Sequence, residues 1–208
     1  MMLNSHADLV ISGCDKIPTP SITQIIDKPP IFNLTNNLRR STGSPFFAKG
    51  NIIYIKGVVY DKNCIPVPGA VIRLWQADSA GYYSHINQDN SNKNSGDYDK
   101  NFVGSGTAIT DNNGLYSFVS VMPGMAKKKP PVLHFLVSAE KMGEINIDAF
   151  FDDKNNVKKY HPNLNKTINP NKLLMEKHEL YLEKEKQDEG KMYIYNFIFD
   201  KESDYRHF

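Results

Sequence analysis

The chain has few cysteines, almost no net charge and no long apolar run, and each of these absences excludes a class of protein. Two cysteines in 208 residues are too few for a disulfide framework. A formal net charge of +2 gives no electrostatic basis for binding nucleic acid. No apolar run approaches the roughly 20 residues of a transmembrane helix, so no transmembrane segment is expected. The hydrophobic content of 40% is typical of a globular domain.

The first residues do not decide in which cellular compartment the protein lies. Residues 11–14, Ile-Ser-Gly-Cys, are similar to a bacterial lipoprotein cleavage box. The stretch before them lacks a basic region and is interrupted by polar side chains, unlike a signal peptide. Two hypotheses follow: a cytoplasmic protein as written, or an envelope lipoprotein anchored through Cys14 if the true start lies upstream of Met1.

Residues 1–32 are predicted to form an extended amino-terminal arm. Prolines interrupt it at four positions and prevent a regular helix: 18, 20, 29 and 30. The arm has no periodic apolar face, so we expect it to pack weakly. Residues 33–208 are predicted to be one domain.

From Asn51 onward the pattern is mostly β. Short β-branched and apolar runs bounded by turn residues predict strands near 53–58, 71–74, 104–110, 115–119, 131–138 and 191–200. Asn113-Gly114 lies between two of these runs and predicts a β-hairpin. Residues 173–187 place apolar side chains near one helical face and indicate a C-terminal helix. The fold class predicted is a single antiparallel β-sandwich with long loops.

The most informative segment is 57–85. It reads G-V-V-Y-D, then P-V-P-G-A-V-I-R-L-W-Q-A-D, then G-Y-Y-S-H. A strand followed by a loop dense in Tyr, His and Asp is how a β-sandwich presents a ligand or metal site at one end. Residues 57–70 and 110–118 by themselves also resemble transthyretin-like modules, most of which bind or connect and have no chemistry.

Residues 74–85 distinguish between these alternatives. They are similar to the motif W-Q-A-N-x-x-G-x-Y-x-H of the intradiol ring-cleavage dioxygenases, the protocatechuate 3,4-dioxygenase and catechol dioxygenase type. Three further stretches resemble segments of that family in the same order: 36–39, 101–106 and 122–124. The resemblance covers about residues 36–152.

The resemblance implies a non-haem Fe(III) held by two tyrosinates and two histidines, because this hard cation favours anionic oxygen, with imidazole completing the set. Carried over by position, the tyrosines fall on Tyr83 and Ala126, and the histidines fall on Val132 and His134. The arginine on the substrate side falls on Lys129, which keeps the charge but loses the planar fork. Two of the four ligands are therefore expected to be missing.

Other residues complete the expected pocket or could rebuild it. Trp75 and His85 lie in the motif, and Asp148 falls where the family has a glutamine. Tyr160 and His161 have the right chemistry to replace the missing ligands, although nothing in the sequence places them near the site. Alternatively, a buried tyrosine and histidine can hydrogen-bond to each other and fill the old pocket.

Three hypotheses remain, in order of preference. The chain is a non-catalytic subunit or descendant that binds a small aromatic molecule or a partner protein. It is an active dioxygenase with a rearranged ligand set, or it is a structural surface module. The cofactor is accordingly none, or Fe(III) held weakly or by rebuilt ligands, and the resemblance implies an oligomer. Because Tyr83 and His134 fall on two ligand positions of one site, we predict that they lie close together at one end of the sandwich, facing a shared cavity.

Overall fold

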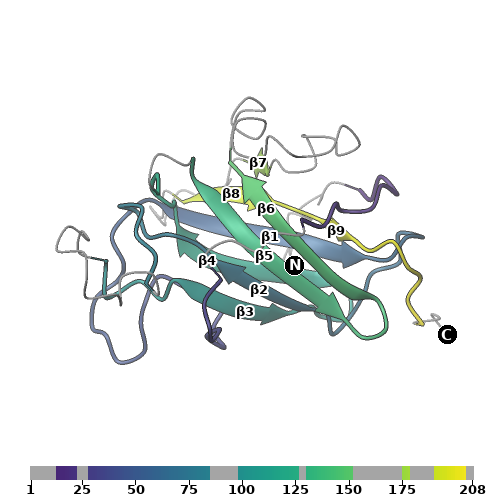
Figure 1. Ribbon diagram of the computed structural model, residues 1–208, viewed down its shortest axis with the longest axis horizontal. Helices are drawn as coiled ribbons and strands as arrows, with labels where there is room; N and C mark the ends of the chain where they lie inside the picture. Colours follow the sequence, from purple (N-terminus) through teal and green to yellow (C-terminus); the bar gives the residue numbers. More distant parts are fainter. Residues whose placement is uncertain are drawn as a thin grey trace, which may run out of the picture.

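The computed structural model describes residues 13–22, 28–84, 98–126, 130–151, 175–178 and 190–204. In these ranges the chain forms two β-sheets packed face to face (Figure 1). One sheet has the order β4-β1-β8-β7, with β9 also paired to β1, and the other has the order β3-β2-β5-β6. The strands are β1 Ile52–Tyr60, β2 Val71–Trp75, β3 Ser105–Ile109, β4 Leu115–Val121, β5 Val132–Ala139, β6 Gly143–Phe150, β7 Glu176–His178, β8 Lys191–Ile194 and β9 Phe197–Ile198. The predicted mostly β class is confirmed.

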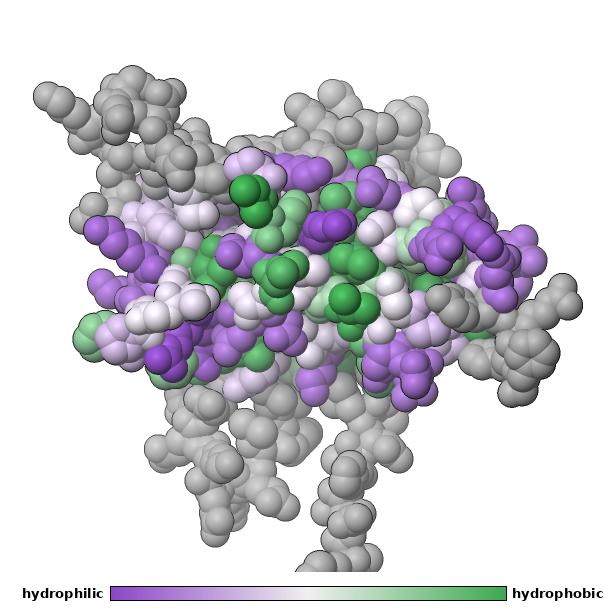
Figure 2. All heavy atoms as spheres, turned by 90° about the horizontal axis from the view of Figure 1, so that it is seen from below, coloured by the Kyte–Doolittle hydropathy of each residue, from purple (hydrophilic) through white to green (hydrophobic). Residues whose placement is uncertain are grey.

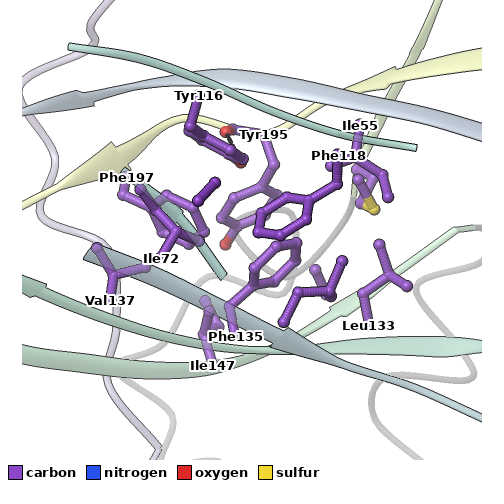
Figure 3. Packing of buried hydrophobic residues seen from close by; sticks show 14 of the residues in the cluster. Ile55, Ile72, Tyr116, Phe118, Leu133, Phe135, Val137, Ile147, Tyr195 and Phe197 are labelled. Atoms are coloured by element: carbon purple, nitrogen blue, oxygen red, sulfur yellow. Dashed lines mark hydrogen bonds between the residues drawn. The ribbon is translucent and has the colours of Figure 1, made fainter. Parts of the chain in front are cut away.

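Aromatic and branched side chains fill the space between the sheets (Figure 3). Alternate residues of β5 point into this space, so Phe135 and Val137 are fully buried. Tyr116 of β4 also lies there, and its hydroxyl donates to the carbonyl oxygen of Tyr195 at 2.7 Å. Burial raises the pKa of both tyrosines, so both phenols stay neutral at physiological pH.

The predicted strand 191–200 is two strands, β8 and β9, and both run parallel to β1. Between them, the side-chain oxygen of Asn196 accepts from the amide of Val58 at 2.9 Å. This side-chain bond interrupts the backbone pairing. Gly57 is required beside it, because a Cβ there would collide with the carbonyl of Tyr195.

Segment 35–38 joins the edges of the two sheets. Its carbonyls accept from the amide of Thr107 on β3 at 3.0 Å and from the amide of Val119 on β4 at 2.9 Å. Leu38 is fully buried between the sheets. The segment therefore covers two strand edges that would otherwise expose unpaired backbone groups.

The predicted hairpin is wrong, because β3 and β4 belong to different sheets. The turn itself forms as its sequence suggests: the Asp111 carboxylate accepts from the amides of Asn113 and Leu115, both at 2.9 Å. Gly114 adopts a φ of +70°. Local turn chemistry reverses the chain, whereas burial of the apolar faces decides which strands pair.

The predicted C-terminal helix is wrong where it can be checked. Residues 176–178 form β7, which pairs antiparallel with β8, and the rest of 173–187 falls outside the described residues. Pairing with a neighbouring strand overrides the weak helical preference of the sequence. No helix within the described ranges is long and apolar enough to cross a membrane.

Strand β6 was not predicted from the residues, although a signal for it exists. Apolar Ile145, Ile147 and Ala149 alternate with polar Asn146 and Asp148, although all five side chains are buried. Because apolar and polar residues alternate in this way on a sheet with two unlike faces, the period alone could have indicated the strand.

The arm shows contacts that were not predicted. Residues 13–22 have no helix or strand and none of them is fully buried, but their backbone hydrogen-bonds to β6 and β9. Cys14 and Cys64 form a disulfide, with a Cα–Cα distance of 5.7 Å, although the cysteine count had not suggested one. A sulfur atom in a disulfide cannot also carry a lipid thioether, so disulfide and lipid anchor exclude each other at Cys14.

Several large hydrophobic side chains remain exposed, but they do not merge into one surface. Figure 2 shows the face that includes β3, where hydrophobic side chains are interrupted by polar ones. Among the described residues, the most exposed of these are Ile31, Leu34 and Phe46. Scattered apolar residues of this kind are normal on protein surfaces and do not mark a docking site.

Asp61 fixes the loop that follows β1. Its carboxylate accepts from the amides of Asn63 at 2.8 Å, Ile65 at 2.9 Å and Ser203 at 3.0 Å. Burial acts to raise the pKa of this carboxyl, but the hydrogen bonds from Ser203, Ile65 and Asn63 outweigh it and lower the pKa. The ionised carboxylate is therefore a stabilising link between this loop and the C-terminal segment.

We expect Asp61→Asn to lower the free energy of unfolding by about 1–3 kcal/mol at pH 7, because an amide N–H would face the donors of Ser203. Since the folded-state pKa is lowered, the carboxylate stabilises the fold above its ordinary value of 3.8 and loses this effect as pH falls through the folded-state value. Urea unfolding at pH 7 and in acid should show the difference shrinking. Asp204→Asn, at an exposed pair with Lys141, serves as the control and should change little. A difference independent of pH would contradict the assignment.

Candidate functional site

Three side chains form a row across the second sheet. Trp75 on β2 lies opposite His134 on β5, which lies opposite Asp148 on β6. Residues directly opposite one another project to the same side of a sheet. Since the neighbours Leu133 and Phe135 point into the core, this row lies on the outer face.

His134 is bonded through both ring nitrogens. Nδ1 lies 2.6 Å from Oδ1 of Asp148, and Nε2 lies 2.7 Å from the hydroxyl of Tyr83. The imidazole also stacks on the indole of Trp75, with ring centroids 5.1 Å apart and an interplanar angle of 20°. All four side chains are buried.

The partners suggest where the protons lie. A carboxylate can only accept, so Nδ1–H of a neutral imidazole donates to Asp148. Nε2 is then left as the acceptor for the hydroxyl of Tyr83. Under this assignment Tyr83 is a neutral phenol whose proton points at His134. We call this arrangement the Tyr83–His134–Asp148 unit.

The loop that carries Tyr83 is built around Asp78. The Oδ1 atom of this buried carboxylate accepts from the amides of Ala80 and Tyr82, both at 2.9 Å, and Oδ2 accepts from the amide of Asp99 at 2.9 Å. These bonds fold the loop back on itself immediately before Tyr83. Placement of the tyrosine therefore depends on Asp78, whose carboxylate accepts from the amide of the preceding residue, Tyr82.

The Pro-Gly turn packs against this loop backbone to backbone. The amide of Gly124 donates to the carbonyl of Asp78 at 2.8 Å. A Cβ on Gly81 would collide with the carbonyl of Met125, and Gly81 also has a φ of +91°. This close approach brings Ala126 against the cluster that contains Trp75, Ala77, Tyr83 and Leu136.

The structure brings together part of the predicted site. The expectation that Tyr83 and His134 lie close together is confirmed by their 2.7 Å contact, and Trp75 stacks beside them. Val132 is buried on the same strand as His134 and belongs to the main hydrophobic core. Four other predicted residues lie outside the described part of the chain: His85, Lys129, Tyr160 and His161.

The bond between His134 and Asp148 was not predicted. Sequence comparison placed Asp148 at a position where the related family has a glutamine, but it did not pair the two residues. The pairing follows from strand register, which puts them directly opposite each other. A prediction of β6 and its register with β5 would have been needed to find it.

The described residues do not fit a four-ligand Fe(III) site. Tyr83 and His134 each present one donor atom, while Ala126 and Val132 have no side-chain donor. Within the described ranges there is no group of three or more His, Cys, Asp and Glu side chains that could hold a metal ion. The chemistry available in this part of the chain is a buried hydrogen-bonded phenol, imidazole and carboxylate.

Comparison with known proteins agrees with this architecture. A dioxygenase family model matches residues 34–201. A protein of Rickettsia bellii, provisionally named a dioxygenase, is 43% identical over 99 residues, which cover 46% of this chain and 48% of that protein. The protocatechuate 3,4-dioxygenase beta chain of Burkholderia cepacia is 34% identical over 92 residues, covering 44% of this chain and 36% of the relative. The chain thus spans about half, or less, of the curated relatives it matches.

Solved structures show the same fold. The dioxygenase domain of a dioxygenase carbohydrate-binding protein fusion from Streptomyces sp. SirexAA-E aligns with a TM-score of 0.63 at 19% identity. The alignment covers 89% of this chain and 100% of that domain. With the family match over most of its length, the chain belongs to the intradiol dioxygenase family.

We expect Asp78→Ala to lower the free energy of unfolding by about 1–3 kcal/mol, because it leaves three partly buried amides without their acceptor. Asp78→Asn keeps one acceptor oxygen and should have a smaller effect. Urea unfolding gives the energies, and near-ultraviolet circular dichroism reports on the packing of Trp75 and Tyr83. Equal losses in both variants would show that the charge, and not the hydrogen-bond geometry, holds the loop.

Proposed function

We propose that this chain is a non-catalytic, binding member of the intradiol dioxygenase family. In this proposal the Tyr83–His134–Asp148 unit stands in place of an iron centre. The observation that carries it is that both ring nitrogens of His134 are hydrogen-bonded to protein side chains. The remnants of the site then serve to hold the loop and the sheet together.

The side chains around the Tyr83–His134–Asp148 unit support this proposal. A carboxylate on Nδ1 is the usual way to orient a metal-binding histidine, so Asp148 alone would be compatible with a metal. However, Ala126 packs against the cluster that contains Tyr83, and Val132 belongs to the core. Methyl groups at these two positions favour a filled apolar site over a coordination sphere.

The binding role is proposed to be that of a subunit. The relative from Burkholderia cepacia is named a beta chain, which is a name for one component of an assembly. By analogy, this chain would associate with a partner subunit of the same family. The proposal also allows a small aromatic molecule, bound against Trp75, as the binding partner.

One observation favours an alternative function, an active dioxygenase with a rearranged ligand set. The 2.7 Å between the Tyr83 hydroxyl and Nε2 of His134 is also a separation that two neighbouring ligands of one metal ion could have. Tyr160 or His161 would have to supply the remaining donors, and Lys129 would provide charge near a substrate. All three fall outside the described residues.

Iron content, colour and oxygen consumption distinguish these functions. We expect the purified protein, after incubation with ferric iron and desalting, to retain no stoichiometric iron and to lack the visible tyrosinate-to-iron absorption band. Oxygen uptake with catechol or protocatechuate should not exceed that of a blank. A coloured protein that consumes oxygen with either substrate would overturn the proposal and establish the alternative.

Restoring the missing ligands tests whether the pocket persists. Val132→His alone should not create a stable site, because the position after the Pro-Gly turn still lacks a phenol. The double variant Val132→His with Ala126→Tyr supplies four ligands, and we expect it to bind Fe(III) and become coloured. It should cleave catechols poorly, since Lys129 and Asp148 occupy positions that orient the substrate in the family.

Iron analysis and absorption spectra, with the single variant as control, check this prediction. Failure of a folded double variant to take up iron would show that the four positions no longer converge. The unit would then be a structural part of the sheet, and the site could not be restored by its ligands alone.

A further inference from the structure

The described part of the arm covers part of the outer edge of the second sheet. β6 is the last strand in the order β3-β2-β5-β6. At Asn146 its backbone carbonyl accepts from the amide of Ile22 at 2.6 Å, and its amide donates to the hydroxyl of Ser21 at 3.1 Å. The side-chain amide of Asn146 also donates to the carbonyl of Ile22 at 2.8 Å. The arm therefore occupies backbone groups that face away from the sheet.

The same segment contacts the other sheet at β9. The amide of Thr19 donates to the carbonyl of Ile198 at 2.8 Å, and the amide of Ile198 donates to the hydroxyl of Thr19 at 2.8 Å. Residues 19–22 thus bridge β9 and β6, on the side of the sandwich away from segment 35–38. Chain that precedes the first strand therefore bridges the two sheets on both sides, while Met175 bonds to Phe150 farther along β6.

Apolar burial contributes little to holding the arm. The side chain of Ile17 is 52% exposed, and Ile22 is only partly buried against the core. Pro18 and Pro20 have no amide hydrogen to donate. The segment is therefore held by hydrogen bonds at two points, which an untethered chain would make and break readily.

The disulfide supplies the tether. Cys14 lies five positions before Thr19 and is bonded to Cys64 in the loop that Asp61 organises. The bond closes a loop with a sequence separation of 50 and fixes the start of residues 13–22 to the loop that follows β1. Both cysteines are only half-buried, so a reductant can reach them.

We propose that the Cys14–Cys64 disulfide is a redox latch that holds residues 13–22 across β9 and β6, and that its reduction releases the arm and uncovers the edge of β6. The co-reactant is a dithiol. One of its thiolates attacks a sulfur of the bond, the other cysteine sulfur leaves as a thiolate, and the second thiol of the reductant displaces the remaining cysteine. Two electrons and two protons end on Cys14 and Cys64, and the reductant becomes a disulfide.

Through the latch, the redox state of the compartment would affect the packing around the Tyr83–His134–Asp148 unit. The latch would be closed in an oxidising compartment and open in a reducing one. Asn146 lies two positions from Asp148 on the same face of β6, so release of the arm loosens the strand that orients His134. The proposal does not depend on whether the family site binds iron.

Hydrogen exchange followed by mass spectrometry tests the latch on the full chain, purified without reductant. Alkylation under denaturing conditions should first find no free thiol. After addition of dithiothreitol, the amides of Ile22, Asn146 and Ile198 should exchange faster, by on the order of tenfold. Amides of β5 should keep their protection. Cys64→Ser should show the fast exchange without reductant.

Asn63→Ser is the matched control, because it alters the same exposed loop but keeps both cysteines. Its exchange should be slow before reduction and fast after it. Three results would overturn the proposal: two free thiols in the untreated protein, unchanged exchange at Asn146 after reduction, or loss of protection throughout β5. In the last case the disulfide would support the whole sandwich and would not act as a latch for the arm.

Discussion

Gln76 is a fully buried amide, and its need for hydrogen-bond partners constrains how the two sheets meet. Its Nε2 donates to the carbonyls of Ala77 and Val121, both at 2.9 Å, and its Oε1 accepts from the hydroxyl of Ser120 at 2.7 Å. Gln76 follows β2 in one sheet, whereas Ser120 and Val121 belong to β4 in the other. A buried amide without these partners would destabilise the fold, so the ends of the two strands are held in one relative position.

The neighbouring residues extend this constraint to the site. Trp75 precedes Gln76 and lies opposite His134, and Asp78 follows it and folds the loop that carries Tyr83. The W-Q-A-D stretch therefore serves as a structural corner as well as a mark of family membership. The residues that shape the site are thus satisfied by hydrogen bonds within the protein.

Contacts between segments that are distant in the sequence also limit what sequence analysis could predict. Strands such as β1 and β5 were found because their apolar runs are long and bounded by turn residues. The hairpin at Asn113-Gly114 was wrong, because a turn determines that the chain reverses and not which sheet the next strand joins. The helix over 173–187 was wrong at β7, where pairing with β8 decided the conformation. Strand β6 was missed although its alternation was present.

By itself, the sequence determined the β-rich class, the family, the closeness of Tyr83 to His134 and the absence of side-chain donors at Ala126 and Val132. The β-rich class and the absent donors follow from residue identity and local pattern, whereas the family and the closeness of Tyr83 to His134 follow from the resemblance to known dioxygenases, carried over position by position. Only the tertiary structure decided that Asp148 bonds to His134, that Cys14 bonds to Cys64 and that the arm covers β6. Each of these contacts joins residues whose distance along the chain says nothing about their distance in space. They depend on strand register and chain path, which the packing of the whole core sets.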